Sequence, residues 1–183
     1  PGFIQSNYGA PGNFEVVVRT ADGRLNHWWR DNVGGRWNDG GRFAQSVAAS
    51  GASLLQSHHG KKGHLELVCV LAKGQMQHWV RDNDENTGWK SIATFGDNYK
   101  SPPCMIEASF GQENENAVGN FELCVAAGGK VHHWWRDNAG GKLWHKGTAF
   151  GHDVVQVTGL AQGSYGFNLE LIVLRTDGKH QHY

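Results

Sequence analysis

The sequence lacks an excess of charge of either sign, with 17 basic and 17 acidic residues. Because nucleic-acid-binding domains generally carry a basic face, a general nucleic-acid binder is not expected. No apolar run approaches the roughly 20 residues that a membrane span needs, so no span is expected. No secretory signal is visible, and the chain starts Pro1-Gly2 without a methionine, which is consistent with a leader that has been removed. A secreted or extracellular location is favoured.

Cysteine is also scarce, and the three cysteines cannot all pair with each other. One disulfide is compatible with this number, but a scaffold built from disulfides is excluded. The sequence has no Ser nucleophile elbow, no phosphate-binding Walker loop and no CxxC motif. No cofactor is therefore predicted.

Glycine and tryptophan are abundant, at 26 and 8 residues, whereas helix formers are sparse. This composition predicts many short strands joined by tight turns. The strongest signal is that the chain repeats itself. A glutamate recurs with spacings of 51, 56 and 48 residues, at Glu15, Glu66, Glu122 and Glu170. An aromatic residue recurs with spacings of 51, 55 and 49 residues, at Trp28, Trp79, Trp134 and Tyr183.

Each repeat reads as four short strands. In the first repeat these are IQSNYG from residue 4, NFEVVV from residue 13, LNHWWRD from residue 25 and a strand that contains Trp37. The second strand alternates apolar and polar side chains. A tight turn joins it to the third strand, and the glycine of Asp22-Gly23 supplies the positive φ that this turn requires. The same turn recurs at Lys73-Gly74, Gly128-Gly129 and Asp177-Gly178, and the fourth strand recurs with Trp89 and Trp144.

Four antiparallel strands in about 50 residues, repeated in tandem, predict an all-β fold, a β-propeller of four-stranded antiparallel blades. About three and a half repeats form a single β-propeller domain or part of one, approximately residues 1–50, 51–102, 103–156 and 157–183, the last incomplete. A β-trefoil has no place for a fourth unit. A fragment of a larger ring and a four-bladed ring with a cropped last blade both remain open. Because a propeller closes to hide its sheet edges, a second copy or further chain is the expected partner.

The repeated pattern of a G-[NH]-[FL]-E-[VL] strand, a tight turn, a His-Trp strand and a Trp-containing strand resembles bacterial seven-bladed propeller lectins. Those lectins bind fucose and related sugars, and the likeness covers all of this chain, repeat by repeat. The resemblance implies a multivalent carbohydrate-binding lectin with pockets between adjacent blades and glycans as partners.

The repeated glutamates lie in mid-strand among apolar residues, where a carboxylate needs a partner. A backbone amide or an arginine of the next blade is expected. A glycosidase concentrates a close carboxylate pair in one place, whereas these carboxylates are spread evenly, so no enzyme is predicted. One histidine per repeat holds either a neighbouring strand or a ligand. Copies in different blades lie too far apart to share a metal ion, and no carboxylate or cysteine has ligand spacing, so no metal site is predicted.

Side chains alternate along the third strand, so His27 and Trp29 face one way while Trp28 and Arg30 face the other. Trp29 becomes Val80 in the second repeat, which indicates simple packing. Trp28 keeps its identity in the second and third repeats. This tryptophan is either core or a platform for the apolar face of a sugar ring.

An Arg-Asp-Asn triplet follows the third strand in each of the first three repeats, beginning at Arg30, Arg81 and Arg136. One interpretation is a turn fixed by an internal Arg–carboxylate pair, which the abundance of Asp and Asn in turns favours. The other is recognition of sugar hydroxyls, to which Asp accepts and Arg donates with charge-assisted strength. The two roles are compatible.

The sequence therefore predicts several equivalent sugar sites, whose repetition gives avidity on a glycan surface. Each site is expected to hold a tryptophan, a histidine, an arginine and an aspartate. The predicted residues are Trp28, Trp79, Trp134, His27, His78, His133, Arg30, Arg81, Arg136, Asp31, Asp82 and Asp137. The alternatives are a propeller scaffold for protein–protein contacts and an accessory propeller domain of a larger secreted enzyme or toxin.

Overall fold

The computed structural model describes residues 2–183, and every regular element in this range is a β-strand. The strands form three four-stranded antiparallel sheets and one three-stranded sheet, each in chain order. Blade 1 holds β1 (Gly2–Gln5), β2 (Phe14–Arg19), β3 (Leu25–Asp31) and β4 (Arg36–Phe43). Blade 2 holds β5 (Val47–Gln56), β6 (Leu65–Leu71), β7 (Met76–Arg81) and β8 (Lys90–Phe95). Blade 3 holds β9 (Cys104–Glu107), β10 (Phe121–Ala127), β11 (Lys130–Arg136) and β12 (Trp144–Phe150). Blade 4 holds β13 (Val154–Gln162), β14 (Leu169–Arg175) and β15 (His180–His182).

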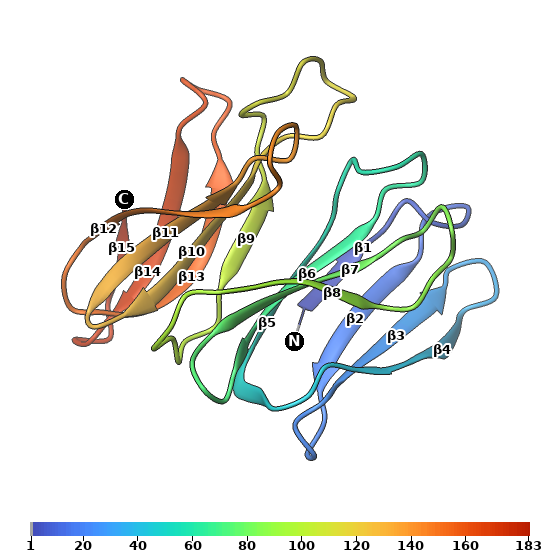
Figure 1. Cartoon of the computed structure of the whole chain (residues 1–183), viewed down its shortest axis with the longest axis horizontal. Coiled ribbons are helices and arrows are strands. Elements are labelled where there is room, and N and C mark those ends of the chain that lie inside the picture. The colour runs from blue at the N-terminus through green and yellow to red at the C-terminus, as the bar shows by residue number, and fades with distance from the viewer. Residues whose placement is uncertain (1) are drawn as a thin grey trace.

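The all-β propeller architecture predicted from the repeat is confirmed. The sheets follow one another as an arc, with blade 1 in blue and blade 4 in red on opposite sides of the view (Figure 1). The first strands of successive blades contact each other, β1 with β5, β5 with β9 and β9 with β13. No helix of residues 2–183 has the length and apolar character needed to cross a membrane.

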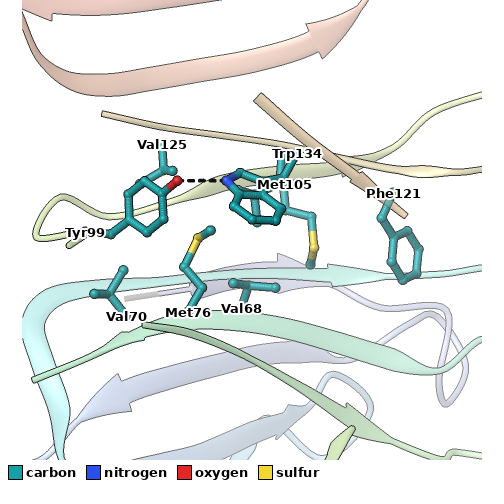
Figure 2. Packing of buried hydrophobic residues seen from close by; sticks show 9 residues of the cluster. Val68, Val70, Met76, Tyr99, Met105, Phe121, Val125 and Trp134 are labelled. Carbon is teal, nitrogen blue, oxygen red and sulfur yellow. Dashed lines mark hydrogen bonds between the residues drawn. The ribbon is translucent and has the colours of Figure 1, made fainter. Parts of the chain in front are cut away.

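Apolar side chains gather between neighbouring blades, so blades 2 and 3 are covered on both faces and blades 1 and 4 on one. One cluster lies between blades 1 and 2 and includes Val17, Leu25, Leu65 and Leu67. A second lies between blades 2 and 3, and Figure 2 shows Met76 of β7 packed beneath Trp134 of β11. The third lies between blades 3 and 4. The fold is therefore held by three layers, and each layer combines residues about one repeat apart.

Two sets of polar contacts repeat at each junction between blades. In the first set, a backbone N–H at or just before the start of one blade donates to the carbonyl oxygen of the turn glycine in the preceding blade. These bonds join Val47 N to Gly23 O (2.8 Å), Tyr99 N to Gly74 O (2.9 Å) and Val154 N to Gly129 O (3.0 Å). In the second set, a loop amide of one blade donates to a side chain on the first strand of the next. The pairs are Asn7 N with Gln56 Oε1 (2.7 Å), His58 N with Glu107 Oε2 (2.9 Å) and Ser109 N with Gln162 Oε1 (2.7 Å). These bonds fix the position of each blade on its neighbour.

Candidate functional site

The repeated glutamate and histidine of each blade form one hydrogen-bonded pair. The glutamate and the histidine lie on the two strands of one β-hairpin. The histidine Nε2 is 2.6–2.8 Å from Oε2 of the glutamate. The pairs are Glu15–His27, Glu66–His78, Glu122–His133 and Glu170–His182. The expectation of a backbone amide or an arginine of the next blade is thus corrected, because the cross-strand histidine of the same blade is close enough to supply the ring N–H.

In blade 2 this pair extends into blade 3. Trp144 Nε1 donates to His78 Nδ1 at 3.2 Å, so the other ring nitrogen of His78 carries the proton that it shares with Glu66. Ser57 Oγ donates to the remaining oxygen of Glu66 at 3.3 Å. His78 is fully buried. The histidine therefore has the structural role of holding a neighbouring strand, and here it also joins two blades.

Burial makes this histidine sensitive to acid. Desolvation lowers the pKa of His78 from its ordinary 6.5, against the opposing effect of Glu66. The unfolded chain then binds a proton that folded His78 resists, so stability is fully present above about pH 6.5 and falls as the pH drops below it. We expect a slope of up to about 1.4 kcal/mol per pH unit from this group.

Urea denaturation between pH 7.5 and 5.5 measures this slope. Partly buried His59 has a pKa that desolvation also lowers, so it adds to the same trend. A His78→Gln variant should show a shallower dependence than the wild type. An identical slope in the two proteins would contradict the assignment.

The Arg-Asp-Asn triplet builds the turn that follows the third strand of each blade. Arg30 Nη1 donates to Asn32 Oδ1 at 2.7 Å, and the equivalent bonds join Arg81 to Asn83 and Arg136 to Asn138. The aspartates accept turn amides. Asp31 Oδ1 accepts from Val33 N, Asp82 Oδ1 from Asp84 N and Glu85 N, and Asp137 Oδ1 from Ala139 N and Gly140 N. The turn interpretation is therefore supported, with one correction: the arginine pairs with the asparagine amide and not with the carboxylate.

The asparagine of the triplet fastens this turn to the loop between the first two strands of its blade. Asn83 Nδ2 donates to Gly63 O at 2.6 Å and Asn138 Nδ2 to Gly119 O at 2.7 Å, and Asn32 donates to Gly12 O in the same way. These hydrogen bonds hold together the two loops at this end of each blade.

The repeated tryptophans occupy three different environments. Trp134 is in the core between blades 2 and 3, where its Nε1 donates to Tyr99 Oη at 2.9 Å (Figure 2). It presents no ring face to a ligand, so its predicted role as a sugar platform is not supported. Trp79 is half-buried, stands edge-on to Phe43 and lines an open cavity with Arg24 and Arg42. Trp28 is half-buried on β3, the third strand of blade 1.

A cavity of about 350 Å³ opens between blades 1 and 2, at the end where the Arg-Asp-Asn turns lie. Blade 1 contributes aromatic, amide, carboxylate and imidazole groups, and blade 2 contributes a guanidinium and an amide. The lining residues are Tyr8, Asn13, Glu15, His27, Trp29, Arg81 and Asn86. Of the predicted set, His27 and Arg81 meet here, on different blades.

The cavity contains residues that the sequence interpretation missed. The change of Trp29 to Val80 in the second repeat indicates packing, but the structure places Trp29 in the lining of the cavity. The signal was present in the alternation of the strand, since His27 and Trp29 share a face. Arg81 Nη2 donates to Asn86 Oδ1 at 3.0 Å, and Asn86 has a φ of 50°. This left-handed backbone is uncommon outside glycine and holds the amide beside the guanidinium.

The matching region between blades 2 and 3 is filled by a side chain. Phe121 of β10 stands edge-on to His59 and His78 of blade 2, with ring centroids 5.9 and 5.8 Å away. Arg136 is buried, and its Cζ lies over this ring, 5.6 Å from the centroid. Leu65 is the smaller residue at the equivalent place of blade 2, so the two junctions are not equivalent.

No protein-family model and no curated protein sequence matches the chain. Solved structures do. The lectin of Aleuria aurantia, as a point mutant in complex with Fucalpha1-6GlcNAc, matches with a TM-score of 0.70 and 17% identity over 94% of this chain and 56% of its own. A structure of that fungal lectin described as a six-bladed β-propeller with a novel fucose recognition mode matches with a TM-score of 0.66 and 18% identity, over 98% of this chain and 57% of its own.

A third match is a triple mutant of AofleA from Arthrobotrys oligospora, with a TM-score of 0.69 and 12% identity over 98% of this chain and 52% of its own. The chain thus spans little more than half the length of these proteins. At such low identity the likeness is one of fold, and the fold that this chain shares with them is the β-propeller.

Proposed function

We propose that the protein is a carbohydrate-binding lectin and that the cavity between blades 1 and 2 is its sugar site. One observation carries the proposal: Glu15 and Trp29 of one blade and Arg81 of the next converge on a single cavity of about 350 Å³. This volume lies in the range of small-ligand sites, and the lining combines two aromatic side chains, Tyr8 and Trp29, with a few convergent polar groups.

The groups of the cavity match the two surfaces of a pyranose. The ring of Trp29 offers a π face to the C–H side of the sugar. Glu15 already accepts from Ser6 at 3.0 Å and from His27 at 2.7 Å, but a carboxylate has about four lone-pair positions and can accept again. Arg81 has five N–H donors, of which Asn83 and Asn86 take two. Glu15 can therefore accept from one sugar hydroxyl and Arg81 can donate to a neighbouring one, both through charge-assisted hydrogen bonds.

The ligand class that we propose is a neutral monosaccharide unit of a glycan, with a terminal fucoside as the first candidate. The A. aurantia lectin, which shares the fold, is described in complex with alpha-methyl-L-fucoside. The proposal is one of binding without catalysis, in keeping with the even distribution of carboxylates among the blades. Glycans outside the cell are the proposed partners, and the proposed location is extracellular.

The proposed sites differ from the equivalent set expected from the repeat. Phe121 occupies the junction between blades 2 and 3, and Val80 stands there in place of Trp29, so this junction lacks both the space and the aromatic wall. Of these two junctions, we therefore propose a sugar site only at the one between blades 1 and 2. Avidity would come from further blade junctions that a second copy or further chain supplies, in a six-bladed ring as in the A. aurantia lectin and not the seven-bladed ring of the bacterial lectins.

A glycan array followed by calorimetry tests the proposal. We expect fucosylated glycans among the bound set, and we expect methyl α-L-fucoside to occupy one site among the two junctions that blades 1, 2 and 3 form. Binding of other monosaccharides in place of fucose would change the ligand and keep the lectin assignment. Failure of every glycan to bind a folded sample would overturn the lectin assignment and leave the protein-contact scaffold in its place.

A further inference from the structure

Two of the three cysteines face each other across adjacent strands. Cys104 on β9 and Cys124 on β10 are directly opposite in the register of blade 3. Both belong to the apolar layer between blades 3 and 4, so their side chains are on the same face of the sheet. The third cysteine, Cys69, is on β6 in the layer between blades 1 and 2. Within residues 2–183 all three are free thiols.

The hydrogen-bond pattern defines the type of this cross-strand pair. Met105 N donates to Ser53 Oγ of β5 at 3.0 Å, so its amide points away from β10. Amides alternate along a strand, and the Cys104 amide therefore points toward β10. Opposite residues in such a hydrogen-bonded pair have Cα atoms about 5.5 Å apart. Disulfides bridge Cα atoms about 4.4–6.8 Å apart, so this Cα separation is suitable. A disulfide also needs Cβ atoms about 3.5–4.5 Å apart, whereas opposite residues have Cβ atoms about 4.5–5.5 Å apart, so β9 must shift toward β10 for the bond to close.

We propose that Cys104 and Cys124 are a redox pair that closes a cross-strand disulfide between β9 and β10 under oxidising conditions. Cys104 Sγ now contacts Val157 O of β13 at 3.5 Å, and closure exchanges this weak contact for the covalent bond. The bond would enclose the long loop between the two strands. It would also hold the strand whose Glu107 accepts from blade 2 through His58 N.

Access to the pair is through Cys104. This residue lines a cavity of about 440 Å³ that is bordered by the first strands of all four blades, next to Pro102 and Pro103. Cys124 is buried and does not line this cavity. A small oxidant that enters the cavity meets Cys104 first, and Cys124 then resolves the intermediate.

A low-molecular-weight disulfide such as oxidised glutathione balances the reaction. The Cys104 sulfur attacks one glutathione sulfur and forms a mixed disulfide, while the other glutathione leaves as a thiolate and takes up the released proton. The Cys124 sulfur then attacks the Cys104 sulfur and expels the second glutathione, which takes up the proton of Cys124. Two protein thiols are oxidised and one disulfide is reduced to two thiols.

The rate of closure depends on local opening. Burial raises the pKa of Cys104 and raises that of Cys124 to about 12, so little thiolate is present in the closed structure. Because the thiolate is the attacking species, closure is expected to be fast during folding and slow in the folded protein. β9 has only four residues, and its opening exposes both sulfurs together.

Thiol counting tests the proposal. The chain is refolded with reduced and oxidised glutathione, denatured and labelled with N-ethylmaleimide. We expect one label per chain and a mass lower by about 2 Da before labelling, against three labels for a dithiothreitol-reduced sample. Cleavage after glutamate separates the segments that carry Cys104 and Cys124 and should leave them linked. Three labels after oxidation, or a link to Cys69, would overturn the proposal.

Matched variants assign the bond. Cys69→Ser should still close it and should show no label after oxidation. Cys104→Ser and Cys124→Ser should each keep two labels under the same conditions. The wild-type label count decides the question even where a serine variant fails to fold.

Discussion

Replacing Trp29 with alanine is expected to weaken monosaccharide binding by about 1–3 kcal/mol, or about 5- to 150-fold, through the loss of one stacked aromatic ring. Trp29 is one of the two aromatic residues that line the cavity between blades 1 and 2, with Tyr8. Calorimetry with the best-binding monosaccharide measures the effect. Circular dichroism of the variant establishes that the all-β fold is retained.

Trp135→Ala is the matched control. Trp135 is the residue of blade 3 at the place of Trp29, and it stacks on His145 with ring centroids 4.4 Å apart. It is remote from the cavity between blades 1 and 2, so its removal should leave the affinity unchanged. Equal affinities for Trp29→Ala and the wild type would place the sugar elsewhere, with the cavity beside Trp79 as the next candidate.

A second variant is expected to fill the same cavity without replacing any residue that lines it. Leu65 is fully buried and is the counterpart of Phe121, which fills the next junction. Leu65→Phe should push an aromatic ring between the blades and abolish binding, at a stability cost of about 1–3 kcal/mol for overpacking. Full affinity in a folded Leu65→Phe protein would contradict the site.

Replacing His78 with alanine is expected to cost about 3–5 kcal/mol of stability, because it leaves a cavity and leaves the buried Glu66 carboxylate with Ser57 Oγ as its remaining side-chain donor. The Glu66 side chain is 2% exposed, and His78 Nε2 lies 2.8 Å from it. The Trp144 indole N–H loses its acceptor in the same step. Urea denaturation monitored by tryptophan fluorescence measures the free energy of unfolding.

His182→Ala removes the same kind of pair at an exposed place. The His182 and Glu170 side chains are 61% and 41% exposed. Solvent screens this pair, so the variant should lose no more than about 1 kcal/mol. Similar losses in the two variants would show that burial does not set the strength of the pair.

The sequence alone was sufficient for the number and order of the strands. The bounds of the first strand differ, because β1 spans Gly2–Gln5 and most of the predicted IQSNYG strand is the loop that follows it. The LNHWWRD segment predicts β3, which spans Leu25–Asp31, and the tight turn before it has Gly23 at a φ of 79°. β12 begins at Trp144, and β8 begins one residue after Trp89. These features depend on side-chain alternation and turn chemistry within a few residues, which a sequence displays directly. The spacing of the four repeated glutamates predicts four consecutive repeats in this chain.

Only the tertiary structure decided which repeated residues form a site. Glu15 and Arg81 meet across a blade junction, Trp144 reaches His78 over 66 positions of sequence, and Phe121 fills one junction where Leu65 leaves the other open. Residues that repeat in register are identical in sequence but meet different neighbours, because each blade packs against a blade of different composition. The volume left between two blades depends on side chains from both of them, and it was this volume, rather than the repeat, that placed Trp29 in the cavity and Trp134 in the core.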